Sequence, residues 1–376
     1  MLPSDPEDDD DVRPPPPKRR GPPMRQGTLQ LVGMTIPQPT PVPEGGWLFV
    51  DLFCSIGGVS VAAKTLGHAV VLAVDMDESR LDVHRANHPD CKHVTMELGP
   101  AVTEEVVALI EEAVPPEQRQ RLWLHQSPPC QTQSSARFFG KLAGGKLATH
   151  ENYHEIKEDK EDGLALVRWS LELVARLRPA QWSLEEVDDK PGQVAGLLQE
   201  YKRKDKALFD YGNVEMAEFG VPQMRRRMIG GRPATMRALR LSQKLRVPRP
   251  VVIQDVVTPP EGAVYLRGIK NRHIKDKTKV RRCKTLEGRW TDGKVELWEF
   301  WLLAPSPCGS HPHAWMDAEY DKIRVLSPAE TGALMTFPSD FAWPDGRCDS
   351  LCNADLGNAV PPLFAQKMIL AASAHV

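Results

Sequence analysis

Apolar runs alternate with segments of helical spacing from about residue 47 onward. The runs typical of buried strands are residues 48–53, 69–74, 122–125 and 181–184. The segments predicted to be helices are residues 59–66, 79–87, 102–114, 163–177, 327–337 and 362–374. Strands that alternate with helices predict an α/β fold, in which a mostly parallel sheet is covered by helices on both faces. Ligands of such sheets bind beyond the carboxyl ends of the strands.

Two segments depart from this pattern. Residues 1–46 contain 12 of the 34 prolines and an acidic run at residues 8–11, so we expect a disordered tail. Residues 232–294 carry 17 Lys+Arg against five Asp+Glu, an excess of +12, and we expect no clear helix between about residue 235 and residue 294. This basic region is either a solvated insertion or a second, smaller lobe that meets a polyanion.

Composition narrows the class of protein. With 376 residues, 41% of them hydrophobic, the chain can bury a core in one large domain or two modest ones. No run of about 18 apolar residues is present, so we expect no membrane span. The first residues are acidic and proline-rich where a signal segment would be apolar, and the seven cysteines are scattered, so we expect an intracellular, reducing location.

The turn after the first strand is a candidate ligand site. Residues 51–58 read Asp-Leu-Phe-Cys-Ser-Ile-Gly-Gly, with small residues where backbone must approach a ligand closely. Asp75 follows at the end of the second strand, at a spacing that suits a carboxylate gripping ribose hydroxyls. A turn with a purely structural role would explain the glycines and the later acidic residue equally well.

Polar groups follow the later strands as well. Cys130, in the loop Ser-Pro-Pro-Cys-Gln at residues 127–131, is placed to act as a nucleophile, although most single cysteines are small buried hydrophobes. Glu185 stands at the end of another strand, and Arg225 and Arg227 share a side of their segment if it is extended. A polar turn at residues 356–362 precedes the last helix.

In this order, the motifs resemble those of the cytosine-C5 methyltransferases that use S-adenosylmethionine. The matching segments are Asp-Leu-Phe-Cys-x-x-Gly-Gly, Pro-Pro-Cys-Gln, Gln-x-Arg-x-Arg and Gly-Asn-Ala-Val. The resemblance covers roughly residues 47–376 apart from the variable region. It implies a Rossmann-like catalytic domain over residues 47–235 and 321–376, and a smaller, irregular target-recognition domain over residues 236–320.

The resemblance also assigns roles. It implies that Cys130 is the nucleophile, that Glu185 holds the N3 edge of cytosine, and that Arg225 and Arg227 lie beside the nucleophile and the flipped base. The implied S-adenosylmethionine-binding positions are Phe53, Cys54, Ser55, Ile56, Gly57, Gly58, Asp75, Met76, Glu97, Leu98, Pro129, Leu166, Asn358, Ala359 and Val360. The implied partner is double-stranded DNA, and we expect a monomer, nuclear if the source is eukaryotic or viral.

Several positions mark a divergent member. Ser55 stands where the family usually has Gly, Gln133 replaces an aromatic residue, and Glu186 replaces an Asn. Thr336 stands where a Gly usually precedes Phe-Pro. None of these changes removes a catalytic group.

The chemistry explains why these residue types are needed. Cytosine C5 is a weak nucleophile, and addition of a thiolate at C6 makes it electron-rich enough to attack a methyl group. A carboxylic acid at N3 stabilises the charge that develops on the ring, and guanidinium groups hold the carbonyl and phosphate. In a duplex the target base is stacked, so it must flip out.

Two other functions stay open. The first is a tRNA cytosine-C5 methyltransferase, although the Cys-Phe-Thr tripeptide of that branch is absent. The second is a catalytically weak, DNA-binding relative.

Cys348 and Cys352 with His311 and His313 suggest a zinc site, but no Cys-x-x-Cys pair exists and we expect no metal there.

The basic region generates a prediction. Neutralising Lys275, Lys277, Arg281 and Arg282 together should weaken DNA binding. The slope of the logarithm of affinity against the logarithm of salt concentration should also become shallower, by about 0.9 for each phosphate contact that is lost. Binding measured over a series of salt concentrations checks this. An unchanged slope would show that these side chains do not contact the backbone of the nucleic acid.

Overall fold

The computed structural model describes residues 43–129, 150–187, 192–245, 250–261, 263–267, 281–282, 296–298, 304–305, 313–316 and 323–373. Its contacts divide the chain into two units, Met1–Pro37 and Gln38–Val376, and all described residues belong to the second. The expected disordered tail therefore lies outside the described residues up to Val42.

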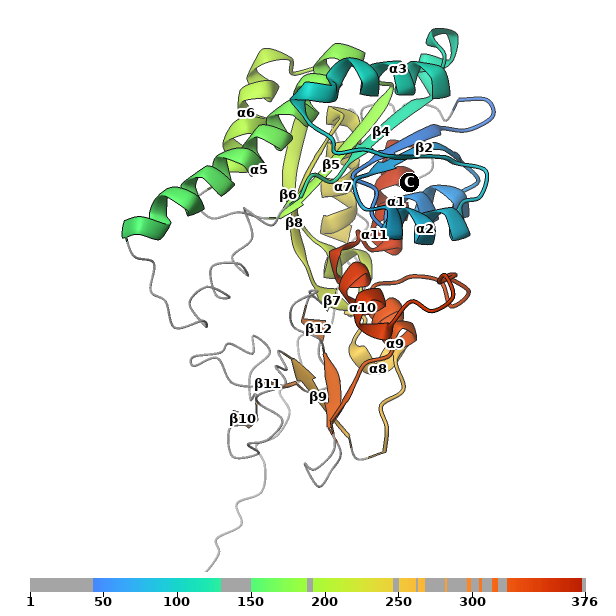
Figure 1. Cartoon of the computed structure of the whole chain (residues 1–376), viewed down its shortest axis with the longest axis vertical. Helices are drawn as coiled ribbons and strands as arrows, with labels where there is room; N and C mark the ends of the chain where they lie inside the picture. Colours follow the sequence, from blue (N-terminus) through green and yellow to red (C-terminus); the bar gives the residue numbers. More distant parts are fainter. Residues whose placement is uncertain are drawn as a thin grey trace, which may run out of the picture. The chain divides into compact units, whose positions relative to one another are not determined.

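A seven-stranded sheet forms the centre of this unit, with the strand order β3-β2-β1-β4-β5-β8-β6 (Figure 1). The strands are β1 (Leu48–Leu52), β2 (Ala69–Asp75), β3 (Lys92–Thr95), β4 (Leu122–Gln126), β5 (Gln181–Val187), β6 (Asp210–Glu215) and β8 (Arg226–Gly231). Strands β1 to β5 pair in parallel, whereas β8 is antiparallel to both β5 and β6. The predicted mostly parallel α/β sheet is confirmed.

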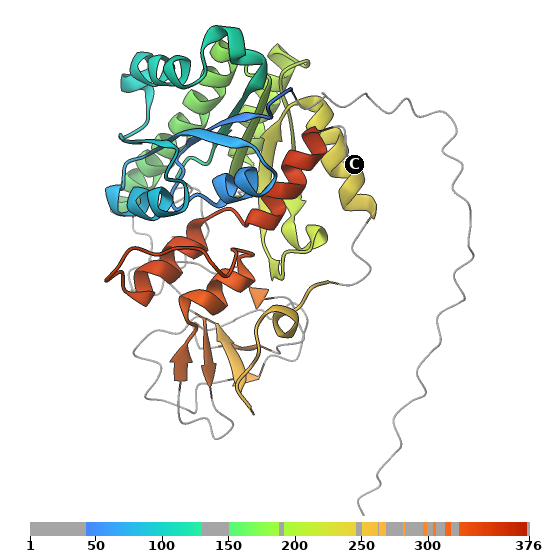
Figure 2. The same cartoon turned by 90° about the vertical axis from the view of Figure 1, so that its right-hand side faces the viewer.

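Helices cover both faces of this sheet, as Figures 1 and 2 show. They are α1 (Gly58–Thr65), α2 (Glu78–Asn87), α3 (Thr103–Ala113), α5 (His150–Leu177), α6 (Gln193–Lys204), α7 (Pro233–Leu245) and α11 (Pro362–Ala372), whereas α10 (Asp349–Asn358) lies beyond the end of the sheet. Short 3₁₀ turns occur at Pro100–Val102, Pro116–Arg121 and Met216–Phe219. No helix in the described part of the chain is long and apolar enough to cross a membrane.

The alternation of side chains along β1 explains the two layers. Leu48, Val50 and Leu52 pack in one apolar cluster with α3, α5 and α6. Trp47 and Phe49 pack in a second cluster with α1, α7 and α11. Because successive side chains of a strand point to opposite faces, a run that is apolar throughout requires cover on both sides.

A second sheet follows in the chain, in the order β10-β11-β9-β13-β14. Its strands are β9 (Val264–Arg267), β10 (Arg281–Arg282), β11 (Glu296–Trp298), β13 (Ala314–Met316) and β14 (Ile323–Val325). Tyr265 and Trp315 lie in its apolar cluster, to which α8 (Ile253–Val256) and α9 (Pro328–Leu334) contribute Ile253 and Leu334. The pair β7 (Gln223–Met224) and β12 (Ala304–Pro305) is parallel and links distant parts of the chain.

The expectation of no clear helix in the basic region after about residue 235 is wrong, because α7 continues to Leu245. Met236 and Leu239 on α7 are buried in the core of the large sheet, so this part of the basic region belongs to that core. Arginines between these apolar positions obscured the helical period in the sequence.

Helix α9 begins with a reciprocal cap. The Ser327 hydroxyl accepts from the backbone N–H of Glu330, and the Glu330 carboxylate accepts from the backbone N–H of Ser327. The same carboxylate accepts from Arg324 and from Trp315 Nε1. Although burial alone would raise the pKa of Glu330, these donors lower it from an ordinary value near 4.5 to about 2.

This carboxylate should make the stability depend on pH. Because the folded pKa lies below the unfolded one, the contribution is complete above about pH 4.5 and is lost as the pH falls toward 2. Glu330→Gln should reduce the unfolding free energy by about 2 kcal/mol at neutral pH and flatten the decline below pH 4.5. Denaturant titrations at several pH values test this, and an equally steep decline in the variant would contradict it.

Candidate active site

The turn after β1 has an unusual backbone. Phe53 and Ser55 have φ values of 58° and 48°, and Gly57 has a φ of 87°. The backbone N–H of Cys54 donates to the Val74 carbonyl (3.1 Å), which holds the turn against β2. Left-handed conformations of non-glycine residues are costly and concentrate at ligand sites, so this geometry marks the turn as a functional element.

Gly58 joins this turn to a segment about 300 residues later in the chain. A side chain at Gly58 would place its Cβ only 2.0 Å from the carbonyl oxygen of Val360. Only a residue without a side chain permits this approach. The structure thus brings the first turn to Asn358, which is exposed, and to the buried Ala359 and Val360, all expected in the cofactor site.

Asp75 lies at the end of β2, beside the turn. Its Oδ2 accepts from the backbone N–H of Ser55 (2.9 Å) and its Oδ1 from that of Asp77 (3.0 Å). Each carboxylate oxygen can accept a further hydrogen bond. The next side chain, Met76, is 62% exposed, which is unusual for a large apolar residue and leaves it available to an aromatic ring.

The remaining cofactor positions gather around Phe53. Its ring meets that of Trp169 edge to face, with centroids 6.1 Å apart, and Trp169 Nε1 donates to Thr103 Oγ1. Leu98 is buried in the same apolar cluster, whereas Glu97 is exposed. Leu166 Cδ2 lies 3.6 Å from the position that a Cβ atom on Gly99 would occupy. Trp169 also lines a pocket with Pro100, Leu164, Ala165, Arg168 and Glu172.

These residues fit S-adenosylmethionine. Asp75 offers acceptors for ribose hydroxyls, and Met76 and Phe53 offer apolar surfaces for an adenine ring. The Ser55 hydroxyl is buried and has no hydrogen-bond partner within the described residues, and a ligand could supply one. Cys54 and Ile56 are buried beneath the turn.

The predicted nucleophile, Cys130, lies outside the described residues, which end at the exposed Pro129 on this side. The start of its loop is held by a group that sequence reasoning missed. His125 on β4 contacts Ser183 Oγ through Nδ1 (2.8 Å) and Ser127 Oγ through Nε2 (3.0 Å). Burial lowers the pKa of His125 to about 3, so the ring is neutral. A histidine within an otherwise apolar strand is the signal that would have found it.

Glu185 on β5 forms an ion pair with Arg227 on β8, with 2.9 Å between Oε1 and Nε. In the register of the two strands Glu185 is opposite Ile229 and Arg227 is opposite Val187, so the pair is diagonal on one face. Glu186 is buried, and its Oε1 accepts from the backbone N–H of Val187. The two neighbouring glutamates therefore have separate environments.

Arg225 has a different position from Arg227. It lies between β7 and β8 and is 2% exposed. Its guanidinium donates to the carbonyls of Gly357 (3.1 Å) and Ala359 (2.9 Å), and its backbone N–H donates to Glu215 Oε1 (2.7 Å). In the described residues, Arg225 thus holds the turn that carries Asn358, whereas Arg227 holds Glu185.

The suggested zinc ligands separate in the structure. Cys348 is exposed and Cys352 is buried, while His313 contacts the hydroxyl of Tyr265. His311 lies outside the described residues. A different group, formed by two histidines and a cysteine, lies close together near the first turn.

Comparison with known proteins supports the resemblance. Residues 48–149 match the family of C-5 cytosine-specific DNA methylases. Type II methyltransferase M1.HphI of Haemophilus parahaemolyticus is 24% identical over 343 residues, which cover 85% of this chain and 84% of the relative.

Solved structures share the fold at low identity. DNMT2 of Spodoptera frugiperda, solved as a triple mutant, has a TM-score of 0.57 at 14% identity, with 87% of this chain and 99% of that chain covered. A DNA modification methyltransferase encoded within a prophage of E. coli has a TM-score of 0.54 at 16% identity and covers 87% and 98%. The resemblance and the Rossmann-like fold are confirmed.

The close approach at Gly58 generates a prediction. Gly58→Ala should weaken S-adenosylmethionine binding at least about tenfold, because a Cβ cannot lie 2.0 Å from the Val360 oxygen and one of the two backbones must move. Gly196→Ala is the matched control, since open space surrounds that helical glycine and the substitution should leave affinity unchanged. Calorimetric titration measures both. Equal affinities would show that the two segments do not form one site.

Proposed function

We propose that the protein transfers a methyl group from S-adenosylmethionine to C5 of cytosine in double-stranded DNA, starting from the match of residues 48–149 to the C-5 cytosine-specific DNA methylases. One observation carries the proposal. The first turn, Asp75 and the segment at Asn358–Val360 meet at the carboxyl end of the parallel strands, where such sheets bind ligands.

The cofactor would be held by residues of both segments. Asp75 would accept from ribose hydroxyls, Met76 and Phe53 would pack against the adenine, and Ser55 and the N–H groups at the start of α1 would bind polar atoms. When bound, S-adenosylmethionine supplies the electrophilic methyl group. The enclosing backbone of Gly58 and Val360 would exclude water from this side of the site.

The nucleobase would be activated by Cys130 and Glu185. The thiolate of Cys130 adds to C6, which makes C5 nucleophilic, and the sulfur leaves again after C5 has lost its proton. Glu185 shares a proton with N3 during the addition. Its ion pair with Arg227 fixes the direction of the carboxylate before the base arrives.

Arg225 and His125 act through other groups. Arg225 positions the turn at Gly357–Ala359 through two charged hydrogen bonds to carbonyl oxygens. His125 positions Ser127 at the start of the Pro-Pro-Cys loop. We assign both as positioning residues.

DNA is favoured over RNA as the substrate. The curated relative is a type II methyltransferase, the family match is to DNA methylases, and the Cys-Phe-Thr tripeptide of the tRNA-modifying branch is absent. The structural likeness to DNMT2 makes tRNA the alternative to test.

The experiment is methyl transfer from labelled S-adenosylmethionine to duplex DNA and, in parallel, to a tRNA pool. We expect label in DNA at cytosine C5, and we expect Cys130→Ser to reduce turnover by more than about 10³-fold, as expected for loss of a covalent nucleophile. Duplex containing 5-fluorocytosine should trap the wild-type protein covalently, because the fluorine cannot be removed as a proton.

The controls separate the alternatives. Cys130→Ser should still bind S-adenosylmethionine, which excludes misfolding as the cause of its inactivity. Label in tRNA alone would establish the RNA substrate. Cofactor and DNA binding without any transfer would identify a non-catalytic relative, and an active Cys130→Ser variant would disprove the mechanism.

A further inference from the structure

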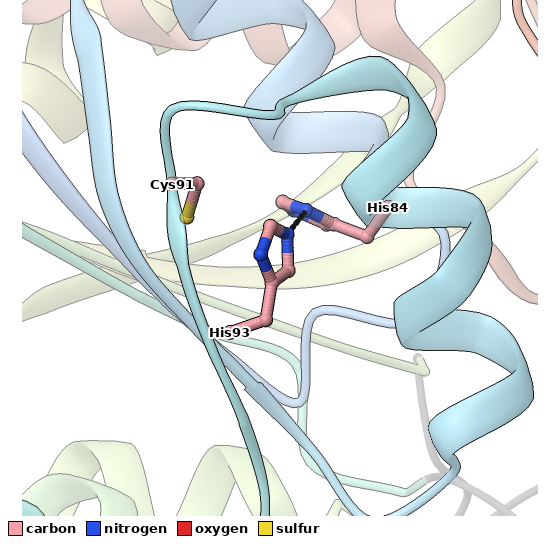
Figure 3. A group of neighbouring side chains, drawn as sticks. All are labelled: His84, Cys91 and His93. Carbon is pink, nitrogen blue, oxygen red and sulfur yellow. Dashed lines mark hydrogen bonds between the residues drawn. The ribbon is translucent and has the colours of Figure 1, made fainter.

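Three metal-ligating side chains converge beside the cofactor turn. His84 comes from α2, Cys91 from the segment before β3, and His93 from β3 (Figure 3). One ligand atom from each lies within 4.8 Å of those of the other two. His84 and Cys91 are buried and His93 is half-buried, so bulk water has little access to the group.

The surrounding hydrogen bonds determine which nitrogen of His84 is free. The Ser60 hydroxyl donates its proton to Asp51 Oδ2 (2.6 Å), so its oxygen accepts from His84 Nε2 (3.0 Å). The proton of the His84 ring is therefore on Nε2, which leaves an unprotonated Nδ1. This Nδ1 faces His93 Nε2 at 2.8 Å.

This arrangement matches the outer shell of a metal site. Histidines that bind metals donate their other N–H to a carboxylate, a carbonyl or water, which fixes the tautomer and the ring. His84 does so through Ser60 to Asp51, and the backbone of Cys91 offers a hydrogen-bond acceptor to the His93 ring. In addition to the hydrogen bond between the two rings, Ser60 orients the ring of His84 and the backbone of Cys91 orients the ring of His93.

We propose that His84, Cys91 and His93 bind a zinc ion, with a water molecule as the fourth ligand. Two imidazoles and a thiolate are a ligand set that zinc prefers, and three protein ligands leave one tetrahedral position open. Bond lengths of about 2.0–2.1 Å to nitrogen and 2.3 Å to sulfur place neighbouring ligand atoms about 3.3–3.7 Å apart. The site reaches this spacing by moving side chains about 1 Å. The thiol releases its proton to solvent, and the single proton of the neutral His93 ring moves from Nε2 to Nδ1, where the backbone of Cys91 accepts it in a hydrogen bond.

The ion would connect α2 and β3 to the cofactor turn. A side chain at Gly57 would lie 2.7 Å from the His84 ring, so this imidazole is packed directly under the turn. Zinc binding should therefore stabilise the fold and the turn together.

The test uses the purified full chain, stripped with a chelator and then titrated with Zn²⁺ or Co²⁺. We expect about one zinc ion per chain by elemental analysis and a rise in Tm. The Co²⁺ form should show the near-ultraviolet charge-transfer absorption of a thiolate ligand. Absence of stoichiometric zinc, or of the thiolate band, overturns the proposal.

Variants identify the ligands. Cys91→Ser should abolish the thiolate band, His93→Gln should weaken zinc binding strongly, and Ser60→Ala should weaken it about tenfold. Cys352→Ala and His68→Gln are the matched controls and should bind as the wild type does. His93 is half-buried, so its variant should fold, and circular dichroism of each metal-free variant checks this. Unchanged zinc affinity in a folded Cys91→Ser or His93→Gln variant contradicts the assignment.

Discussion

The candidate site depends on two hydrogen bonds from one buried cation. Arg225 donates to the carbonyls of Gly357 and Ala359, and these bonds fix the turn whose next carbonyl, that of Val360, lies against Gly58. Without them, a buried guanidinium would be left without these acceptors and the last segment of the site would lose its support. The backbone N–H of the same arginine donates to Glu215 at the end of β6. This hydrogen bond fixes β6 beside the start of β8, the strand that carries Arg227.

Much of the fold was predictable because the burial pattern is simple. Strands β1 and β4 carry apolar side chains on both faces, and only a sheet covered by two layers of helices can bury such runs. The proximity of the glycine turn and Asp75 was predictable as well, because the carboxyl ends of neighbouring parallel strands meet at one edge. The turn at Asn358 ends a helix, and its place in the site was expected only from the family resemblance. The contact between Gly58 and Val360 was not predictable, since contact between distant segments leaves no periodic signal in one sequence.

Other features had no local signature. Helix α7 carries apolar residues at 236 and 239 among arginines, and its identity depends on the partner helix α11 that buries them. Arg225 and Arg227 are two positions apart, yet one is bound to backbone carbonyls and the other to Glu185. Residue type alone does not distinguish these positions, because the difference arises where β7 ends and β8 begins.

Ser55 should give the turn after β1 a ligand selectivity that a glycine there would not provide. Its left-handed backbone and its buried hydroxyl, which has no partner among the described side chains, both destabilise the free protein. A bound molecule that hydrogen-bonds this hydroxyl removes one of these costs, whereas an analogue without the matching group leaves it in place. The chain should therefore discriminate among closely related nucleoside ligands more sharply than a relative with glycine at this position.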